Sequence, residues 1–173
     1  MNWVNWLKEG EIKVKKSIFA VLLVLWMGFI FSMSCENAEK SSNTSGKTIE
    51  AVLSVVPEFE KQPEEVKKNI IEELQFITRK SAHFIGYMIL GILAIGLILQ
   101  YENINKKPQL AFLICVLYAI SDEIHQLFVP GRAGQVRDVL IDSSGSFLGI
   151  FLVMFFVRFL RKIRNKNKIN NTK

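Results

Sequence analysis

Four long apolar segments constrain the fold of this chain more than any other feature. The first, SIFAVLLVLWMGFIFSM, runs from Ser17 to Met33 without a charged residue. A bilayer core of about 30 Å needs about 20 apolar residues in an α-helix. Two of the segments reach this length, the other two reach it only with their polar ends included, and such a set is not typical of a soluble core. We therefore predict an all-α integral membrane bundle, formed by one domain over residues 1–173. The four transmembrane helices are expected at residues 17–34, 82–99, 109–129 and 139–160.

The first segment has a second interpretation. Lysines precede it at positions 13, 15 and 16, so a cleaved signal peptide fits the charge pattern. The apolar run is longer than a typical signal core, and this length favours a retained helix.

Charge distribution predicts the orientation. With four spans both termini lie on one side, and that side carries 13 basic and 3 acidic residues, against 9 basic and 13 acidic residues on the other. Basic residues concentrate in cytoplasmic loops. We predict a multi-pass cell-membrane protein with both termini cytoplasmic, an extracellular loop over 35–81 and a basic cytoplasmic tail over 161–173. The positive net charge is then a topology and lipid-headgroup signal, and we assign no nucleic-acid partner.

The long outer loop contains one strong helix signal. Pro63-Glu64-Glu65 is typical of a helix start, and apolar residues follow at helical spacing between Val66 and Ile77. We predict an extra amphipathic helix here, lying on the membrane surface or against the bundle. Residues 36–47 are expected to be irregular, and residues 49–56 to form a short helix that ends at Pro57.

Ionisable residues gather at one end of the predicted bundle. Such groups are costly near lipid unless they are paired or face a polar cavity. On the third helix Asp122, His125 and Gln126 share one face, whereas Glu123 is expected to point to one side.

The fourth helix contributes a second set of acids. Asp138 is placed to cap its start. Asp142 lies one turn deeper, on a face that continues through Gly145-Ser146 to Gly149. Small residues at this spacing allow close helix approach, so Asp142 is expected to face another helix and not lipid.

The chemistry of these residues suggests a site. His83 and His125, the only histidines, map to the same end of different helices beside carboxylates, which suits general acid–base catalysis. The candidate catalytic residues are His83, His125, Asp122 and Asp142. Lys80, Arg132 and Arg137 suit a phosphate or pyrophosphate group, which makes a lipid-linked phosphate the candidate ligand. The other members of the cluster are Tyr87, Glu123, Gln126 and Asp138.

Two alternatives stay open at this point. Arg132 and Arg137 are able to neutralise the surrounding acids, so the cluster is also compatible with a structural ion-pair network that closes the bundle end. An Asp/Glu/His set also suits a divalent cation. No ligand spacing is diagnostic, however, so no metal is assigned and the cofactor is unknown.

These residues resemble the motifs of the VanZ-like family. The resembling segments are Phe31-Ser32, Lys80-Ser81-Ala82-His83-Phe84 with Tyr87, Tyr118-Ala119-Ile120-Ser121-Asp122-Glu123-Ile124-His125-Gln126, Val129-Pro130-Gly131-Arg132, and Arg137-Asp138-Val139-Leu140-Ile141-Asp142 with Gly145. They cover most of the chain from the first helix to the fourth, and the loop over 37–77 matches least. The founding member of the family is associated with resistance to the glycopeptide teicoplanin. The resemblance implies a bacterial cell-envelope protein with outward-facing polar motifs, but it supplies no settled reaction.

Two functional hypotheses follow. In the first, the outer Asp/His/Arg site binds or modifies a lipid-linked anionic envelope component and thereby contributes to glycopeptide resistance. In the second, the protein is a non-catalytic membrane accessory protein, whose polar cluster is structural and whose outer amphipathic helix docks an unknown protein partner. A small transporter is less favoured, because no charged residue marks a polar path through the helix centres.

Overall fold

The chain is mostly helical and has no strand in the part that the structure describes. The computed structural model describes residues 3–35 and 38–170, and the side chains of residues 14–35 and 46–165. Its helices are α1 (Trp3–Ser34), α2 (Ala38–Leu53), α3 (Pro57–Glu60), α4 (Glu64–Ile98), α5 (Lys107–Gln126) and α6 (Val136–Asn170). The prediction of an all-α protein is confirmed.

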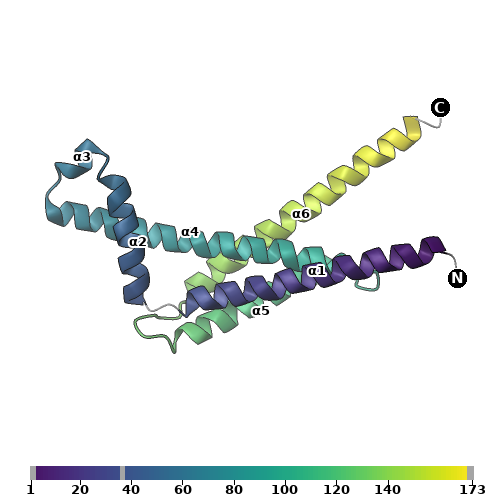
Figure 1. Ribbon diagram of the computed structural model, residues 1–173, viewed down its shortest axis with the longest axis horizontal. Helices are drawn as coiled ribbons and strands as arrows, with labels where there is room; N and C mark the ends of the chain where they lie inside the picture. Colours follow the sequence, from purple (N-terminus) through teal and green to yellow (C-terminus); the bar gives the residue numbers. More distant parts are fainter. Residues whose placement is uncertain (1–2, 36–37, 171–173) are drawn as a thin grey trace.

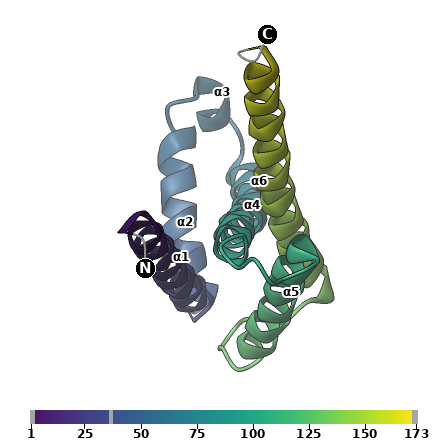
Figure 2. The ribbon, with the colours of Figure 1, turned by 90° about the vertical axis from the view of Figure 1, so that its right-hand side faces the viewer.

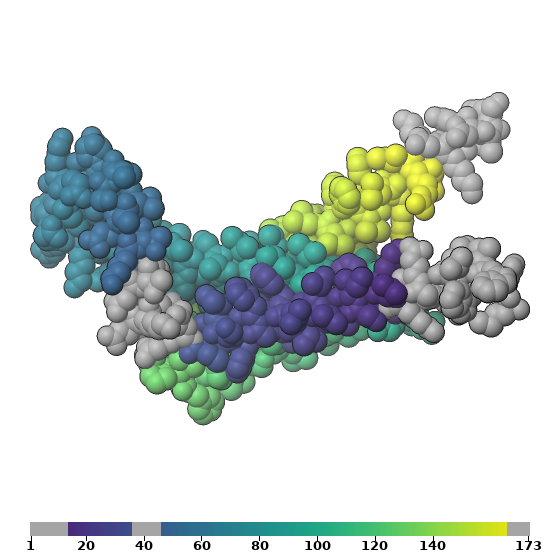
Figure 3. All heavy atoms as spheres, in the orientation of Figure 1, coloured from purple at the N-terminus to yellow at the C-terminus, as the bar shows by residue number. Residues whose placement is uncertain are grey.

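The four long helices alternate in direction (Figure 1). α1 and α5 run toward the end of the molecule where α2 and α3 project, whereas α4 and α6 run away from it. Seen end-on, α4 lies between α1 and α6, with α5 beside them (Figure 2). α4 contacts α1, α5 and α6, so it is the central helix of the bundle. The α2–α3 segment and the second half of α6 extend beyond the body of the molecule (Figure 1), and the coloured part of that half diverges from the other helices in the space-filling view (Figure 3).

Three helices in the described part are long and apolar enough to cross a membrane. They are Val14–Ser34 within α1, Glu64–Ile98, which is all of α4, and Val136–Asn165 within α6. Many large apolar side chains on them face outward, among them Val24, Leu25 and Phe155, as contact with lipid requires. α5 occupies the position of the predicted 109–129 span and is 20 residues long. It is not one of the three helices that are both long and apolar enough.

The predicted amphipathic helix is not a separate element. It is the first half of α4, which continues without a break from Glu64 to Ile98. No proline or glycine stands between Pro63 and Gly86, so nothing in the backbone ends the helix where the sequence changes from charged to apolar.

The prediction for residues 36–47 was also wrong. α2 begins at Ala38, and residues 36–37 lie outside the described residues. α2 packs closely on the first half of α4, where a Cβ on Gly46 would overlap the side chain of Gln75. Of the predicted tail, residues 161–170 continue α6, and residues 171–173 are outside the described residues.

Small residues bring α4 and α6 together. A Cβ on Gly145 would overlap the backbone of Phe84, and one on Gly149 would overlap the backbone of Met88. Gly91 meets the backbone of Ser146 in the same way. The predicted close approach through the Gly145–Gly149 face is therefore confirmed. It places the start of α6 directly beside the middle of α4, where His83 lies.

Candidate functional site

Three helices each contribute one side chain to a compact polar cluster. His83 comes from α4, Asp122 from α5 and Asp142 from α6, and their possible ligand atoms all lie within 4.8 Å of one another. Asp122 is 2% exposed and Asp142 is fully buried. The prediction that Asp142 faces another helix is confirmed, because its carboxylate lies 3.5 Å from Nδ1 of His83. We call these three residues the central triad.

Asp122 is oriented by two donors. The hydroxyl of Ser34, at the end of α1, donates a hydrogen bond of 2.8 Å to Oδ2 of Asp122. Nε2 of Gln126 donates to the same oxygen over 3.4 Å. The other oxygen, Oδ1, is buried and has no hydrogen-bond partner among the described residues. One edge of the carboxylate is therefore fixed, while the other edge is open.

Asp142 is less satisfied than Asp122. Neither of its carboxylate oxygens has a hydrogen-bond partner within the described part of the chain, since the 3.5 Å approach of His83 is an ion-pair distance and not a short hydrogen bond. The hydroxyl of Ser146 donates to the backbone carbonyl of Asp142 and not to its carboxylate. The buried Tyr87 hydroxyl also has no partner in the described chain. Unsatisfied buried polar groups are uncommon in folded proteins, so these atoms are candidates for contact with a ligand.

The spacing predicted that Glu123 points to one side of the polar face. In the structure its carboxylate is buried and hydrogen-bonded. It is 5% exposed, and its Oε2 accepts a 2.8 Å hydrogen bond from the backbone N–H of Gln135. Its Oε1 accepts a longer bond from Gln126. The α5–α6 connection folds back over the end of α5. The hydrogen bond from Gln135 to the Glu123 carboxylate holds the connection in this position.

Lys80 and Asp138 form an ion pair between α4 and α6. Both side chains are mostly buried. α6 begins at Val136, two residues before Asp138, so this acid lies in the first helical turn and not at the capping position. Arg137 stands over the ring of Phe76, with 5.7 Å between the guanidinium carbon and the ring centroid. The ion pair with Asp138 thus already neutralises the ammonium group of Lys80 within the protein.

His125 lies toward α1. Its Nε2 is 3.2 Å from the sulfur of Cys35, and its ring is 4.4 Å from the ring of Phe31 between centroids. It is not a member of the central triad. The two histidines thus have different surroundings, although they come from the same end of the bundle.

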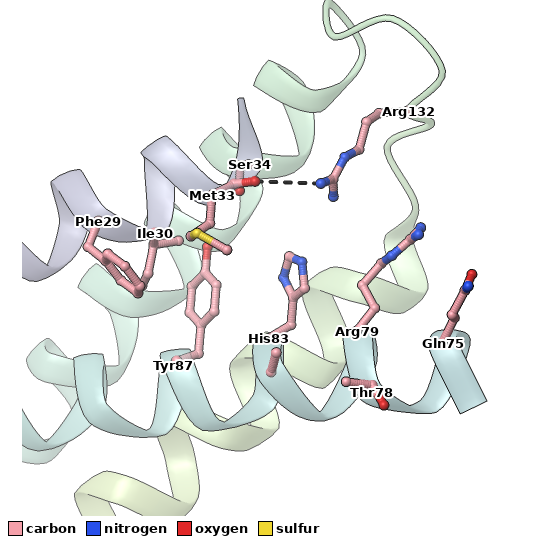
Figure 4. A pocket seen from close by; sticks show the side chains of 12 residues that line it. Phe29, Ile30, Met33, Ser34, Gln75, Thr78, Arg79, His83, Tyr87 and Arg132 are labelled. Atoms are coloured by element: carbon pink, nitrogen blue, oxygen red, sulfur yellow. Dashed lines mark hydrogen bonds between the residues drawn. The ribbon is translucent and has the colours of Figure 1, made fainter. Parts of the chain in front are cut away.

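A pocket of about 300 Å³ lies between α1 and α4, beside the central triad. Figure 4 shows His83 between Tyr87 and Arg79 along α4, with its ring directed toward the side where Ser34 and Arg132 lie. Arg132 donates to the backbone carbonyl of Met33 over 3.5 Å. The lining residues are Phe29, Ile30, Met33, Ser34, Gln75, Thr78, Arg79, Ala82, His83, Gly86, Tyr87 and Arg132. The pocket combines an apolar wall with two arginines and a histidine.

Ser34 and Arg79 line the pocket but were not among the residues proposed from the sequence. Ser34 follows Ile30 by one helical turn and shares its face, but the sequence alone does not mark that face as buried. Arg79 precedes the Lys80-Ser81-Ala82-His83 motif and is four residues from His83, so the same rule places both on one face of α4.

Comparison with known proteins identifies the family. No curated protein and no solved structure matches the chain. The model of the VanZ/LLP1 family matches residues 19–158, which include the central triad, the Lys80–Asp138 pair and every residue that lines the pocket. Since this match extends from α1 into α6 and covers most of the sequence, the chain belongs to the VanZ/LLP1 family.

Proposed function

We propose that this protein is a multi-pass protein of the bacterial cell membrane that binds a lipid-linked anionic component of the envelope. The observation that carries the proposal is the pocket between α1 and α4, which joins an apolar wall to Arg79, His83 and Arg132. A lipid-linked phosphate has the same two parts, an apolar chain and an anionic head. The proposal takes the bundle as four spans with cytoplasmic termini, so that the pocket opens at the outer leaflet.

The arginines are the proposed anion-binding groups. A guanidinium has five N–H donors and is able to bind phosphate in a bidentate manner while keeping another contact. Arg132 and Arg79 line the pocket from the α5–α6 connection and from α4. Lys80 has a smaller part in the proposal, because Asp138 engages its ammonium group. Arg137 has no part in the proposed anion binding, since its guanidinium lies over the ring of Phe76 and it does not line the pocket.

The apolar wall is the proposed contact for the lipid chain. Phe29, Ile30 and Met33 come from the last turns of α1, and Ala82, Gly86 and Tyr87 come from α4. Gly86 has no atom within 4 Å of the position that a Cβ would take, so this side of the pocket is open. A chain seated here would continue along the apolar surface of the spans.

A binding measurement tests the proposal directly. Wild-type protein in nanodiscs is titrated with a polyprenyl phosphate, and the uncharged polyprenol serves as the ligand control. Arg79→Ala and Arg132→Ala should each weaken phosphate binding at least tenfold and leave polyprenol unaffected, whereas Arg137→Ala should bind as the wild type does. Equal affinity of the wild type for phosphate and alcohol would contradict the proposal.

Glycopeptide resistance is the proposed biological effect. The chain is expressed in a teicoplanin-susceptible bacterium, and the minimal inhibitory concentration of teicoplanin is measured with membrane abundance in the same cells. Wild-type protein should raise this concentration, and His83→Ala and Asp142→Asn should abolish the rise at equal abundance. If the wild type and both variants raise it equally, the triad has no part in the phenotype.

The accessory-protein alternative also has a supporting observation. Val66 and Ile77, at the two ends of the predicted amphipathic stripe in the first half of α4, are exposed, as expected of a surface that docks a partner. Under this hypothesis Val66→Ser with Ile77→Ser abolishes the phenotype, and the triad substitutions reduce stability alone.

A further inference from the structure

We propose that the central triad, His83, Asp122 and Asp142, binds a divalent transition-metal cation. The sequence supported no metal assignment, because the three residues come from separate motifs with no diagnostic spacing. The site goes beyond the proposed function, since it requires no phosphate ligand.

The distances suit one shared ion. The candidate ligand atoms lie within 4.8 Å of one another, and Nδ1 of His83 is 3.5 Å from Oδ1 of Asp142. Bonds of about 2.0–2.2 Å to nitrogen and oxygen put two ligands of a tetrahedral ion roughly 3.3–3.6 Å apart. The His83–Asp142 pair already has this separation, and a ligand atom of Asp122 lies within 4.8 Å of both.

The unsatisfied atoms are the independent evidence. Both oxygens of the fully buried Asp142, and Oδ1 of the nearly buried Asp122, have no hydrogen-bond partner among the described residues. Two ionised carboxylates buried beside one imidazole repel each other and are costly without a countercharge. A divalent cation would supply that charge and use the open oxygens.

The surrounding contacts resemble those that support metal ligands. Carboxylate ligands are commonly held in place by hydrogen bonds to their second oxygen. Ser34 and Gln126 both donate to Oδ2 of Asp122, which leaves Oδ1 for the ion. His83 of the triad and Ser34, the donor to Asp122, also line the pocket, so the triad borders it at these two residues.

The donor set favours Zn²⁺ or Mn²⁺. An imidazole nitrogen selects against Ca²⁺ and Mg²⁺, which prefer oxygen ligands. Three protein ligands leave at least one position open. An anionic group in the pocket would occupy that position, and this last step alone rests on the proposed function.

Metal content tests the site. Wild-type protein in detergent is stripped with chelator, incubated with Zn²⁺ or Mn²⁺, passed through a desalting column and analysed by mass spectrometry for bound metal. The wild type should retain about one ion per chain, and Asp142→Asn and His83→Gln should retain less than a tenth of this. The matched control is His125→Gln, which changes the same residue type outside the triad and should retain the wild-type amount.

His125→Gln is a sharp control, because Cys35 and His125 lie 3.2 Å apart and a thiol beside an imidazole is an alternative place for a transition metal. Loss of metal in this variant, with metal retained in Asp142→Asn, would overturn the proposal. A wild type that binds neither ion would also overturn it, even if the triad variants fail to fold.

A thermal measurement gives a second readout. At a concentration 100 times the dissociation constant, the bound ion should raise the melting temperature of the wild type by about 5–10 °C and should not raise that of Asp142→Asn. Equal shifts in the two proteins would contradict the site. Metal retention without polyprenyl phosphate binding would reject the proposed function while leaving the cation site intact.

Discussion

Single polar atoms hold the site together, and Ser34 is the clearest case. Its hydroxyl is the closest donor to Asp122, and both side chains are buried. Removing a donor from a buried ionised acceptor leaves that acceptor with its desolvation cost and without the bond. Ser34 therefore affects the position of Asp122 although it comes from a different helix.

We predict that Ser34→Ala destabilises the protein by about 1–3 kcal/mol. The measurement is thermal unfolding in detergent, followed by circular dichroism. Ser32→Ala is the matched control, because Ser32 is exposed in the same helical turn, and it should unfold as the wild type does. An equal effect of the two substitutions would show that helix propensity, and not the bond to Asp122, is responsible.

The sequence identified the members of the site better than their partners. Asp122, Asp142 and His83 were all expected at one end of the bundle, because ionisable residues near lipid need a polar environment. The pairing of Lys80 with Asp138 and the position of His125 against Cys35 were not predictable. These contacts depend on the rotation of each helix about its axis, and one sequence does not determine that rotation between helices.

At the scale of elements, the contact of α4 with α6 determines where the triad forms. Gly145 and Gly149 let the two backbones approach closely. Without a hydrophobic driving force between helices in lipid, such packing is a main source of association. A larger residue on this face would push α6 away from α4 and separate Asp142 from His83.

We predict that Gly145→Ala destabilises the bundle by about 1–3 kcal/mol, the usual cost of overpacking. Thermal unfolding of the purified protein measures this change. Gly28→Ala is the control, since a Cβ there would meet nothing within 4 Å, and the substitution should be neutral or slightly stabilising through helix propensity. A neutral Gly145→Ala would mean that the close approach is not needed.

A third prediction concerns the Lys80–Asp138 pair, which ties α4 to the start of α6. Lys80→Met leaves Asp138 without its partner in a mostly buried position, and such breakage costs about 3–5 kcal/mol. Lys80→Met with Asp138→Leu should recover most of this loss, because neither charge then needs a partner. Unfolding of both variants in the same detergent checks the result, and a double variant no more stable than the single one would contradict the pairing.

The long helices were predictable in position more than in extent. Apolar windows found the cores of α1, α4, α5 and α6, because lipid and protein interiors select the same residues. Their limits were missed where the helix outlasts the apolar run, as between Glu64 and Arg79 in α4. A helix stops where its backbone hydrogen bonding stops, and a change of polarity alone does not end it. α4 therefore begins directly after Pro63 and continues to Ile98.

At the scale of the whole molecule, α5 decides the topology. A helix of 20 residues rises about 30 Å, which matches the thickness of a bilayer core. α5 lies between α4 and α6 in the chain and runs antiparallel to both (Figure 1). If α5 crosses, the bundle has four spans and the termini share a side. If α5 does not cross, the start of α1 and the end of α6 must lie on opposite sides of the membrane, although both are at the same end of the molecule (Figure 1).

The last prediction therefore compares the two flanks of α5 in a Cys35→Ser background, with Cys115 kept because it is buried. Glu102→Cys and Phe128→Cys place exposed thiols before and after α5, and a membrane-impermeant maleimide is applied to intact and to permeabilised cells. The charge distribution predicts that the basic side is cytoplasmic, so Phe128→Cys should react in intact cells and Glu102→Cys only after permeabilisation. Glu58→Cys on α3 should behave like Phe128→Cys, and Arg161→Cys like Glu102→Cys. Reaction of both flanking thiols in intact cells would show that α5 does not cross, and it would leave the pocket without an assigned side.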